Sequence, residues 1–237
     1  MADTLVEAQG IHTYYGDSHI LRGVDFTVCT GEAIGLMGRN GMGKTTLIRT
    51  LLGLVRARRG CVLVRGEAMT GAAPYRIACR GIAYVPEGRG VFPNLDVREN
   101  LVMAARASVA GRREWTLSRV LATFPRLGER LGLRGDRLSG GEQQMLSIGR
   151  ALMTNPDLLI LDEATEGLAP LVAQEIWRIL RDLRATGIAV VIVDKNHAAV
   201  TKLTDRNVIL VKGEVVFQGT SDELRARPEI LHRYLGV

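Results

Sequence analysis

Residues 38–45 read Gly-Arg-Asn-Gly-Met-Gly-Lys-Thr, which matches the pattern G-x-x-x-x-G-K-[ST]. Glycines at this spacing let backbone N–H groups curl around phosphate oxygens, and a following helix adds partial positive charge at its N-terminus. The pattern places Lys44 to reach the terminal phosphates of a nucleotide and Thr45 to ligate Mg²⁺. An aliphatic run, Ala33–Met37, precedes the motif, and a helix-like run, 46–52, follows it. We therefore predict a phosphate-binding loop formed by Gly38, Arg39, Asn40, Gly41, Met42, Gly43, Lys44, Thr45 and Thr46.

A second aliphatic run, residues 158–161, ends in the two acids Asp162 and Glu163. Such a segment taken alone is typical of a strand that runs into solvent. Beside a phosphate-binding loop it gains a chemical meaning, because phosphoryl transfer needs both a metal ligand and a group that orients water. We predict that Asp162 holds Mg²⁺ and that Glu163 polarises the attacking water.

Residues 138–144 read Leu-Ser-Gly-Gly-Glu-Gln-Gln, and we call them the signature segment. Ser139 and Glu142 fit a capping box, S-x-x-E, which predicts the start of a helix that continues to Met153. The adjacent Gly140 and Gly141 would expose backbone donors at that helix N-terminus, which is a second place for an anion.

Short aliphatic runs that alternate with helix-like stretches indicate an α/β domain with a largely parallel sheet. The expected strands are 33–37, 82–85, 158–161 and 188–193, with shorter ones at 27–28, 62–64, 208–211 and 215–217, the last two joined as a hairpin. Residues 88–144 are rich in Ala, Leu and Arg and predict helices at 97–106 and 115–124. We expect one domain, with a core of residues 1–87 and 145–237 and a helical subdomain of residues 88–144.

The charge and cysteine pattern excludes several classes of protein. The net charge is +6, from 31 Lys and Arg against 25 Asp and Glu. The basic residues do not interleave with aromatic ones, which disfavours a nucleic-acid groove. Cys29, Cys61 and Cys79 show no C-x-x-C spacing and predict reduced, buried thiols of a cytosolic protein. No signal peptide and no run of about 18 apolar residues is visible, so we expect any membrane role to need a membrane-spanning partner.

Together, the loop at 38–45, the signature segment and the strand ending in Asp162-Glu163 resemble the nucleotide-binding subunit of an ABC (ATP-binding cassette) transporter. The resemblance covers essentially the whole chain. It implies a P-loop NTPase core with an N-terminal antiparallel β portion and an inserted helical subdomain, and it implies ATP and Mg²⁺ as cofactors. It also implies a paired subunit, so that Ser139, Gly140 and Gly141 touch the γ-phosphate held by the partner. Tyr15 falls at the position that stacks on adenine, although a tyrosine in a Tyr-Tyr-Gly turn is more typical of packing.

Several positions depart from the usual family pattern. Glu87 takes the place of a glutamine between core and helical subdomain, where it can still ligand Mg²⁺. Lys195 takes the place of the switch histidine and could stabilise phosphate charge, and Ala169 replaces the aspartate of the loop after Glu163. We hypothesise that Glu87 and Lys195 form a compensating ion pair. His197 is two positions out of register, and we expect it to be an exposed helix-start residue.

Within the family, the phrases at 81–89, 91–93, 138–152 and 167–170 resemble the second ATPase subunit of bacterial branched-chain amino acid importers. The resemblance implies a second ATPase subunit, two integral membrane permease subunits and, indirectly, a periplasmic solute-binding protein. It implies a peripheral location on the cytoplasmic face of the inner membrane. Residues 87–94 would receive a short helix of the permease, although Phe92 and Leu95 could instead belong to the core of the helical subdomain.

Other interpretations remain open. Close relatives of this branch import urea or short amides, and the ATPase never touches the solute. A regulatory subunit that no longer hydrolyses ATP would explain Glu87 and Lys195 but not Glu163. A soluble ABC ATPase would normally carry a coiled-coil insertion or two cassettes. A P-loop kinase or GTPase would leave the signature segment without a role.

Overall fold

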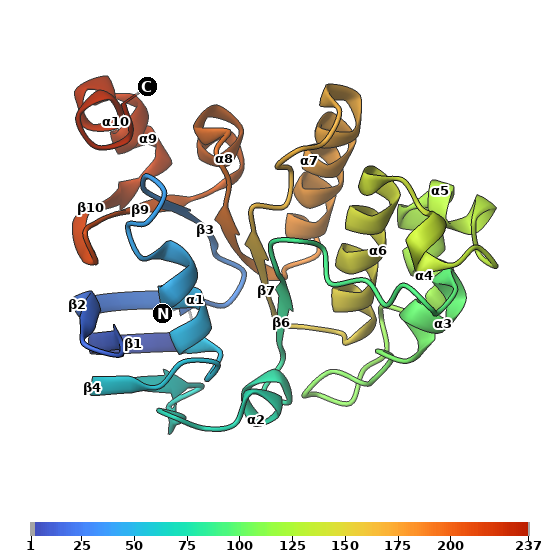
Figure 1. Cartoon of the computed structure of the whole chain (residues 1–237), viewed down its shortest axis with the longest axis horizontal. Coiled ribbons are helices and arrows are strands. Elements are labelled where there is room, and N and C mark those ends of the chain that lie inside the picture. The colour runs from blue at the N-terminus through green and yellow to red at the C-terminus, as the bar shows by residue number, and fades with distance from the viewer. Residues whose placement is uncertain (1–2, 237) are drawn as a thin grey trace. The chain divides into compact units, whose positions relative to one another are not determined.

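The computed structural model describes residues 3–236, which divide into two compact units. Unit 1 contains the chain up to Arg80 and again from Ala189 onward, and unit 2 contains Gly81–Ile188. Figure 1 labels most of the helices and strands, and the two units are described separately below.

The N-terminal part of unit 1 is an antiparallel sheet with the strand order β2-β1-β4-β5. Strands β1 (Thr4–Tyr15) and β2 (Ser18–Cys29) form a long hairpin, and β4 (Ala57–Val64) and β5 (Glu67–Ala68) extend the sheet. The buried faces of β1 and β2 carry apolar side chains such as Ile11, Leu21 and Phe26. The sheet therefore has one face packed and one face partly open to solvent.

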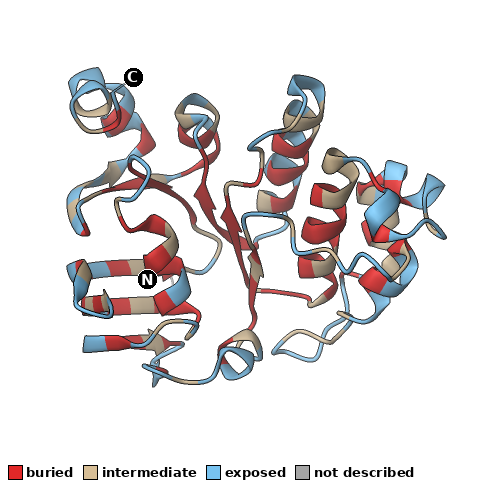
Figure 2. Ribbon diagram, in the orientation of Figure 1, coloured by how far each residue is buried: buried red, intermediate tan, exposed pale blue. Residues whose placement is uncertain are grey.

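The remaining strands of unit 1 are neighbours in the order β10-β9-β3-β8. Strand β3 (Ala33–Met37) pairs in parallel with both β8 (Ala189–Val193) and β9 (Arg206–Val211). Strand β10 (Glu214–Thr220) returns antiparallel to β9 through the turn at Lys212 and Gly213. All five residues of β3 and of β8 are buried, as the red colouring in Figure 2 shows, which explains their continuous aliphatic sequences.

The described part of unit 1 also contains five helices: α1 (Lys44–Leu51), α2 (Pro74–Ala78), α8 (His197–Leu203), α9 (Ser221–Arg225) and α10 (Pro228–Leu235). Helix α1 follows β3 through residues 38–43, which is the strand–loop–helix arrangement that the glycine motif requires.

Unit 2 contains two parallel strands and a group of helices. Strand β6 (Ile82–Val85) pairs with β7 (Leu158–Asp162). The helices are α3 (Val97–Val102), α4 (Leu117–Thr123), α5 (Pro125–Glu129), α6 (Gly140–Met153) and α7 (Pro170–Arg184), with a 3₁₀ turn at Gly135–Arg137. Helix α6 buries most of its residues, and side chains such as Val120, Phe124 and Leu127 join the same core.

The predicted α/β fold class, with mainly parallel strands and an N-terminal antiparallel sheet, is confirmed. Two of the predicted helices are shorter than expected. Helix α3 stops at Val102, and the backbone N–H of Arg106 instead donates to the carbonyl of Met153. Helix α4 begins at Leu117, because Thr116 caps it and the N–H of Trp115 donates to Asn155 Oδ1 (2.7 Å).

The expectation of buried cysteines was wrong. All three thiols are free, but Cys29 and Cys61 are half-buried and Cys79 is exposed. Cys79 directly follows the short helix α2, whose only buried side chain is Ile77.

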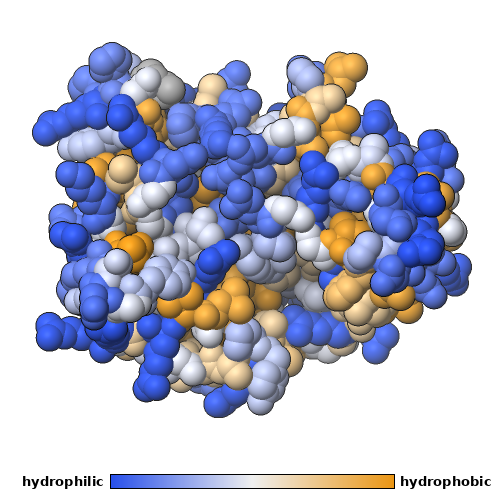
Figure 3. Space-filling model, viewed as in Figure 1, coloured by the Kyte–Doolittle hydropathy of each residue, from blue (hydrophilic) through white to orange (hydrophobic). Residues whose placement is uncertain are grey.

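Among residues 3–236, no helix is both long enough and apolar enough to cross a lipid bilayer. On the face drawn in Figure 3, hydrophobic side chains form small separate groups among hydrophilic ones.

The buried side chain of Asn100 holds the segment that follows β6. Its Oδ1 accepts from the N–H of Phe92 (3.0 Å), and its Nδ2 donates to the carbonyls of Phe92, Leu95 and Asp96 (3.0–3.1 Å). One amide therefore satisfies four backbone groups in a segment without regular structure.

We predict that Asn100→Ala lowers the free energy of unfolding by about 2 kcal/mol, because it leaves these backbone groups without partners in a site with no exposed area. Urea unfolding followed by circular dichroism measures the change. Asn94→Ala is the matched control, since Asn94 is exposed and its side chain accepts a hydrogen bond from Arg134 at the surface. Equal stability of the two variants would contradict the role given to Asn100.

Candidate functional site: a phosphate-binding loop, an acidic cluster and a capped helix

The loop between β3 and α1 depends on glycine at two close approaches. Gly38 has φ 145°, and a Cβ there would collide with the carbonyl oxygen of Leu210. Gly43 has φ 104° and directly precedes α1, where a Cβ would lie 3.0 Å from Leu21 Cδ2. The loop is therefore held against β2 and β9 with its backbone N–H groups gathered at the start of a helix.

Lys44 is buried at the N-terminus of α1, with only 8% of its surface exposed. Its Nζ donates to the carbonyls of Gly38 (2.8 Å) and Arg39 (3.1 Å), so the ammonium group lies inside the curve of the loop. Arg39, Asn40 and Gly41 are exposed, Met42 and Thr45 are half-buried, and Thr46 is buried. A cation enclosed by a glycine loop can neutralise a phosphate chain, which is the chemistry predicted for residues 38–46.

Beside Lys44 lies His197, the first residue of α8. Burial lowers the pKa of His197, the positive charge of Lys44 lowers it further, and Asp194 opposes the shift. The Nδ1 atom of His197 is buried and has no hydrogen-bond partner. The prediction that His197 is an exposed residue was wrong, because its ring is half-buried next to the lysine of the loop. Lys195, by contrast, is exposed.

The two adjacent tyrosines at the end of β1 differ in their surroundings. The ring of Tyr14 stacks on His19 (centroids 4.2 Å apart, planes 5° apart), and the guanidinium of Arg58 lies 4.4 Å from its centroid. Tyr15 is 44% exposed at the turn of the hairpin. Of the two rings, Tyr15 is thus the one available to stack on a ligand.

In unit 2, β7 ends at Asp162, whose carboxylate is completely buried. The hydroxyl of Tyr84, on the neighbouring strand β6, donates to its Oδ2 at 3.2 Å. Tyr84 contributed nothing to the sequence prediction, because a strand tyrosine gives no sign of which neighbour it contacts.

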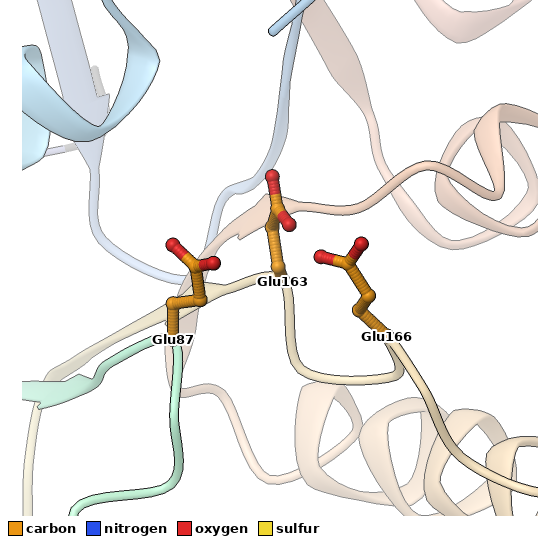
Figure 4. A group of neighbouring side chains, drawn as sticks. All are labelled: Glu87, Glu163 and Glu166. Carbon is orange, nitrogen blue, oxygen red and sulfur yellow. The ribbon is translucent and has the colours of Figure 1, made fainter.

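Three carboxylates form an acidic cluster, which we define as Glu87, Glu163 and Glu166. One oxygen of each lies within 4.8 Å of the others. Figure 4 shows their side chains pointing to the same side, from the segment after β6 and from the turn after β7. Glu163 has φ 53°, and its carbonyl accepts from the N–H of Glu166 (3.2 Å). Sequence reasoning singled out Glu87 and Glu163 but missed Glu166, whose position only the turn reveals.

Such a cluster concentrates negative charge and gathers oxygen acceptors around one point. Carboxylates this close repel one another, so a water molecule or a hydrated cation between them is favoured. Glu87 is exposed, Glu163 is half-buried and Glu166 is exposed. The arrangement can therefore accept a proton from water, or orient water, at the surface of unit 2.

The signature segment caps α6 as predicted. The N–H of Glu142 donates to Ser139 Oγ (3.3 Å), and the N–H of Ser139 donates to Glu142 Oε2 (2.8 Å). Burial raises the pKa of Glu142, but hydrogen bonds from Ser139 and the nearby Arg130 guanidinium outweigh it, so the pKa lies below its usual value. Ser139 itself is exposed, which leaves the tip of a 14-residue helix open to solvent.

The two signature glycines make room for different neighbours within unit 2. A Cβ on Gly141 would lie 2.6 Å from Val172 Cγ1 on α7, and a Cβ on Gly140 would lie 2.8 Å from Nη2 of Arg89. Both glycines are therefore fixed by packing as well as by any ligand. Like Tyr84 and Glu166, Arg89 was not among the site residues predicted from the sequence.

The structure thus groups the predicted site residues within each unit. Unit 1 brings together residues 38–46 and His197, and it carries Tyr15 and Lys195. Unit 2 brings together Glu87 and Glu163 and carries Asp162 and the signature segment. The roles assigned to these residues stay predictions.

We predict that the stability of the chain without nucleotide falls as the pH drops below about 6.5, with His197 as one cause. The folded state holds the pKa of His197 below its usual value of 6.5, so the unfolded chain binds the proton first as the pH falls. Proton binding lowers the free energy of the unfolded state and thereby reduces the free energy of unfolding. His197→Asn should flatten the pH dependence of the urea midpoint between pH 7.5 and 5.5. His232→Gln, which changes an exposed histidine, should leave the dependence as it is. An unchanged slope in His197→Asn would refute the assignment.

Sequence comparison identifies relatives over nearly the whole chain. Residues 21–166 match the ABC transporter family. The high-affinity branched-chain amino acid transport ATP-binding protein BraG of Pseudomonas aeruginosa is 42% identical over 95% of this chain and 97% of its own length. The probable branched-chain amino acid transport ATP-binding protein LivF of Archaeoglobus fulgidus is 35% identical over 94% and 95%. The lipopolysaccharide export system ATP-binding protein LptB of Acidithiobacillus ferridurans is 33% identical over 98% and 97%.

Solved structures agree with this grouping. An ATP-binding cassette of an ABC transporter in its ADP conformation has a TM-score of 0.83 and 25% identity, covering 99% of both chains. A dimeric ATP-binding cassette in a post-hydrolysis state with ADP and Pi has a TM-score of 0.79 and 25% identity, covering 92% of this chain and 99% of that one. This chain therefore belongs to the ABC transporter family, as an ATP-binding subunit whose ATPase activity is coupled to transport.

Proposed function

We propose that this chain is one of two ATPase subunits that drive a membrane importer for branched-chain amino acids. The observation that carries the proposal is the 42% identity to BraG over 95% of the chain. LivF supports the same solute class at 35% identity.

Two such subunits would enclose ATP between them. The loop at 38–46 of one subunit would hold the phosphates, and Tyr15 would stack on the adenine. Ser139, Gly140 and Gly141 of the other subunit would close over the γ-phosphate with the tip of α6. The exposed Ser139 and the open helix N-terminus support this role, because they are available to an outside anion. The dimeric relative bound to ADP and Pi supports the pairing.

The donor set of the chain fits Mg²⁺. The hydroxyl of Thr45, the buried carboxylate of Asp162 and the carboxylate of Glu87 are hard oxygen ligands of the kind that Mg²⁺ prefers. When bound, the ion would neutralise charge on the phosphate oxygens. The Tyr84 hydroxyl would keep Asp162 oriented, since a buried carboxylate needs hydrogen-bond partners.

In hydrolysis, the protein must position water in line with the γ-phosphate and remove a proton from it. Glu163 is suited to this task, because its carboxylate is half-buried at the end of β7 and directly follows Asp162. Lys44, enclosed by the loop, would hold the phosphate being transferred, and Lys195 would add a positive charge near it. His197 joins this neighbourhood as a neutral ring beside Lys44.

A hydrolysis-impaired regulatory subunit is the second candidate function. The specific observation in its favour is the pair of departures at Glu87 and Lys195, and the exposed Lys195 side chain is not fixed by burial. The retained Glu163 favours a hydrolytic subunit.

Evidence on the transported solute and on the direction of transport comes from the relatives of this chain. LptB, an export protein, is also 33% identical over nearly the full chain, so the family match by itself does not choose between import and export. We favour import of branched-chain amino acids over urea or short amides because the 42% match is to that class. The proposed partners are a second ATPase subunit, two permease subunits contacting residues 87–94 on the cytoplasmic side of the inner membrane and, indirectly, a periplasmic solute-binding protein.

We predict that Glu163→Gln abolishes ATP turnover while retaining ATP binding, because the amide keeps the shape of the side chain but cannot accept a proton. Phosphate release in the assembled complex measures turnover, and retention of labelled ATP after gel filtration measures binding. The control is Glu129→Gln, which changes an exposed glutamate at the end of α5. Undiminished phosphate release by Glu163→Gln would favour the regulatory candidate.

The tagged chain, purified from its native membrane in mild detergent, should carry a second ATPase subunit and two integral membrane proteins with it. In vesicles containing this complex and its solute-binding protein, ATP should drive leucine uptake. Uptake of urea instead of leucine would indicate an importer of urea or short amides. If the purified complex exported lipid, the proposal that it is an importer would be overturned.

A further inference from the structure

Arg89 extends along the start of α6, in the place that the missing side chain of Gly140 leaves open. Its Nη1 donates to Gln143 Oε1 at 3.1 Å, and a Cβ on Gly140 would lie within 3.0 Å of three atoms of its guanidinium. Gln143 in turn donates from Nε2 to the carbonyl of Gly135 (2.9 Å), which fixes the amide that orients Arg89. All of these residues lie in unit 2.

The position of Arg89 is unfavourable both for its charge and for its backbone conformation. The N-terminus of a helix carries partial positive charge, so a guanidinium there is repelled rather than attracted. Arg89 also has φ 69°, a left-handed conformation that is unfavourable for a residue with a side chain. Folding alone would favour a small or acidic residue here, and such exceptions concentrate at functional sites.

No carboxylate forms an ion pair with the guanidinium of Arg89 among residues 3–236. The side chain to which the guanidinium donates, Gln143, is neutral. Glu142, the nearby acid of the capping box, is already engaged by Ser139 and Arg130. The half-buried guanidinium therefore adds an unbalanced positive charge to the exposed tip of α6.

The segment around Arg89 is tied down, which keeps the guanidinium from swinging into solvent. Arg150, from the body of α6, donates to the carbonyl of Gly90 and lies over the ring of Phe92 (4.5 Å). Asn100 holds both backbone groups of Phe92. A pre-positioned arginine loses less entropy when it binds a phosphate than a mobile one does.

We propose that Arg89 binds the terminal phosphate of the ATP held by the partner subunit, together with Ser139 and the N–H groups of Gly140 and Gly141. This assignment rests on the proposed pairing of two ATPase subunits. Arg89 supplies the full positive charge that the helix tip lacks, because the tip offers only partial charges and a neutral hydroxyl. Its guanidinium can form two parallel hydrogen bonds to phosphate oxygens. The arginine thus makes subunit closure depend on the γ-phosphate.

The test uses the full chain in a Glu163→Gln background, with the second ATPase subunit where that subunit co-purifies. Light scattering measures the ATP concentration at which the subunits associate. We expect Arg89→Gln to raise that concentration roughly tenfold, the loss of about one charge-assisted hydrogen bond. Arg89→Lys should recover part of the loss, and Arg98→Gln, which changes an exposed arginine of α3, should have no effect.

Two further readouts separate phosphate binding from a structural role. Association should weaken with rising salt, and Arg89→Gln should show a shallower salt dependence because one screened charge is gone. Binding of a fluorescent ATP analogue to the subunit's own loop should be the same with and without Arg89. The proposal would be overturned if Arg89→Gln associated at the same ATP concentrations as Arg98→Gln. It would also be overturned if Arg89→Gln weakened binding of the ATP analogue as much as it weakened association. If the Glu163→Gln chain with Arg89 intact does not associate at any ATP concentration, the proposed pairing of two ATPase subunits is refuted instead.

Discussion

The loop between β3 and α1 is possible only because its glycines bring no side chain of their own to the contacts with two other strands. Gly38 lies against the carbonyl of Leu210 on β9, and Gly43 lies against Leu21 on β2. These contacts place the loop where the antiparallel hairpin and the parallel strands of unit 1 meet. The Lys44 ammonium can then be enclosed by carbonyls that face inward. Everything proposed for the nucleotide depends on this close approach.

Unit 2 uses the same device at the start of α6. Gly141 lets α7 approach through Val172, and Gly140 admits the guanidinium of Arg89. Helix α7 follows the turn that carries Glu163 and Glu166. The tip of α6, the acidic cluster and the segment after β6 are therefore parts of one packed group. A shift of α7 against α6 would change the positions of both the carboxylates and the exposed serine at the helix tip.

The sequence was most informative where periodicity and motif coincided. Strands β3, β6, β7 and β8 are continuous aliphatic runs bounded by turns, so their existence and the parallel arrangement could be predicted. Strand β1 was missed, because irregular register near Gly10 interrupts the alternation of its side chains. The end of α3 and the start of α4 were also missed, since tertiary hydrogen bonds that Arg106 and Trp115 donate to Met153 and Asn155 decide them. Glu166 and the half-buried His197 depend on turn geometry and packing, which no spacing rule conveys.

The stacked ring of Tyr14 has a consequence for the choice of base. His19 and Arg58 contact that ring, so the proposed stacking on the base is assigned to the neighbouring, exposed Tyr15. A stacking face recognises a flat aromatic ring but reads neither donors nor acceptors on its edge. A site built this way would discriminate poorly between adenine and guanine, and the cellular abundance of each nucleotide would decide which one the subunit consumes.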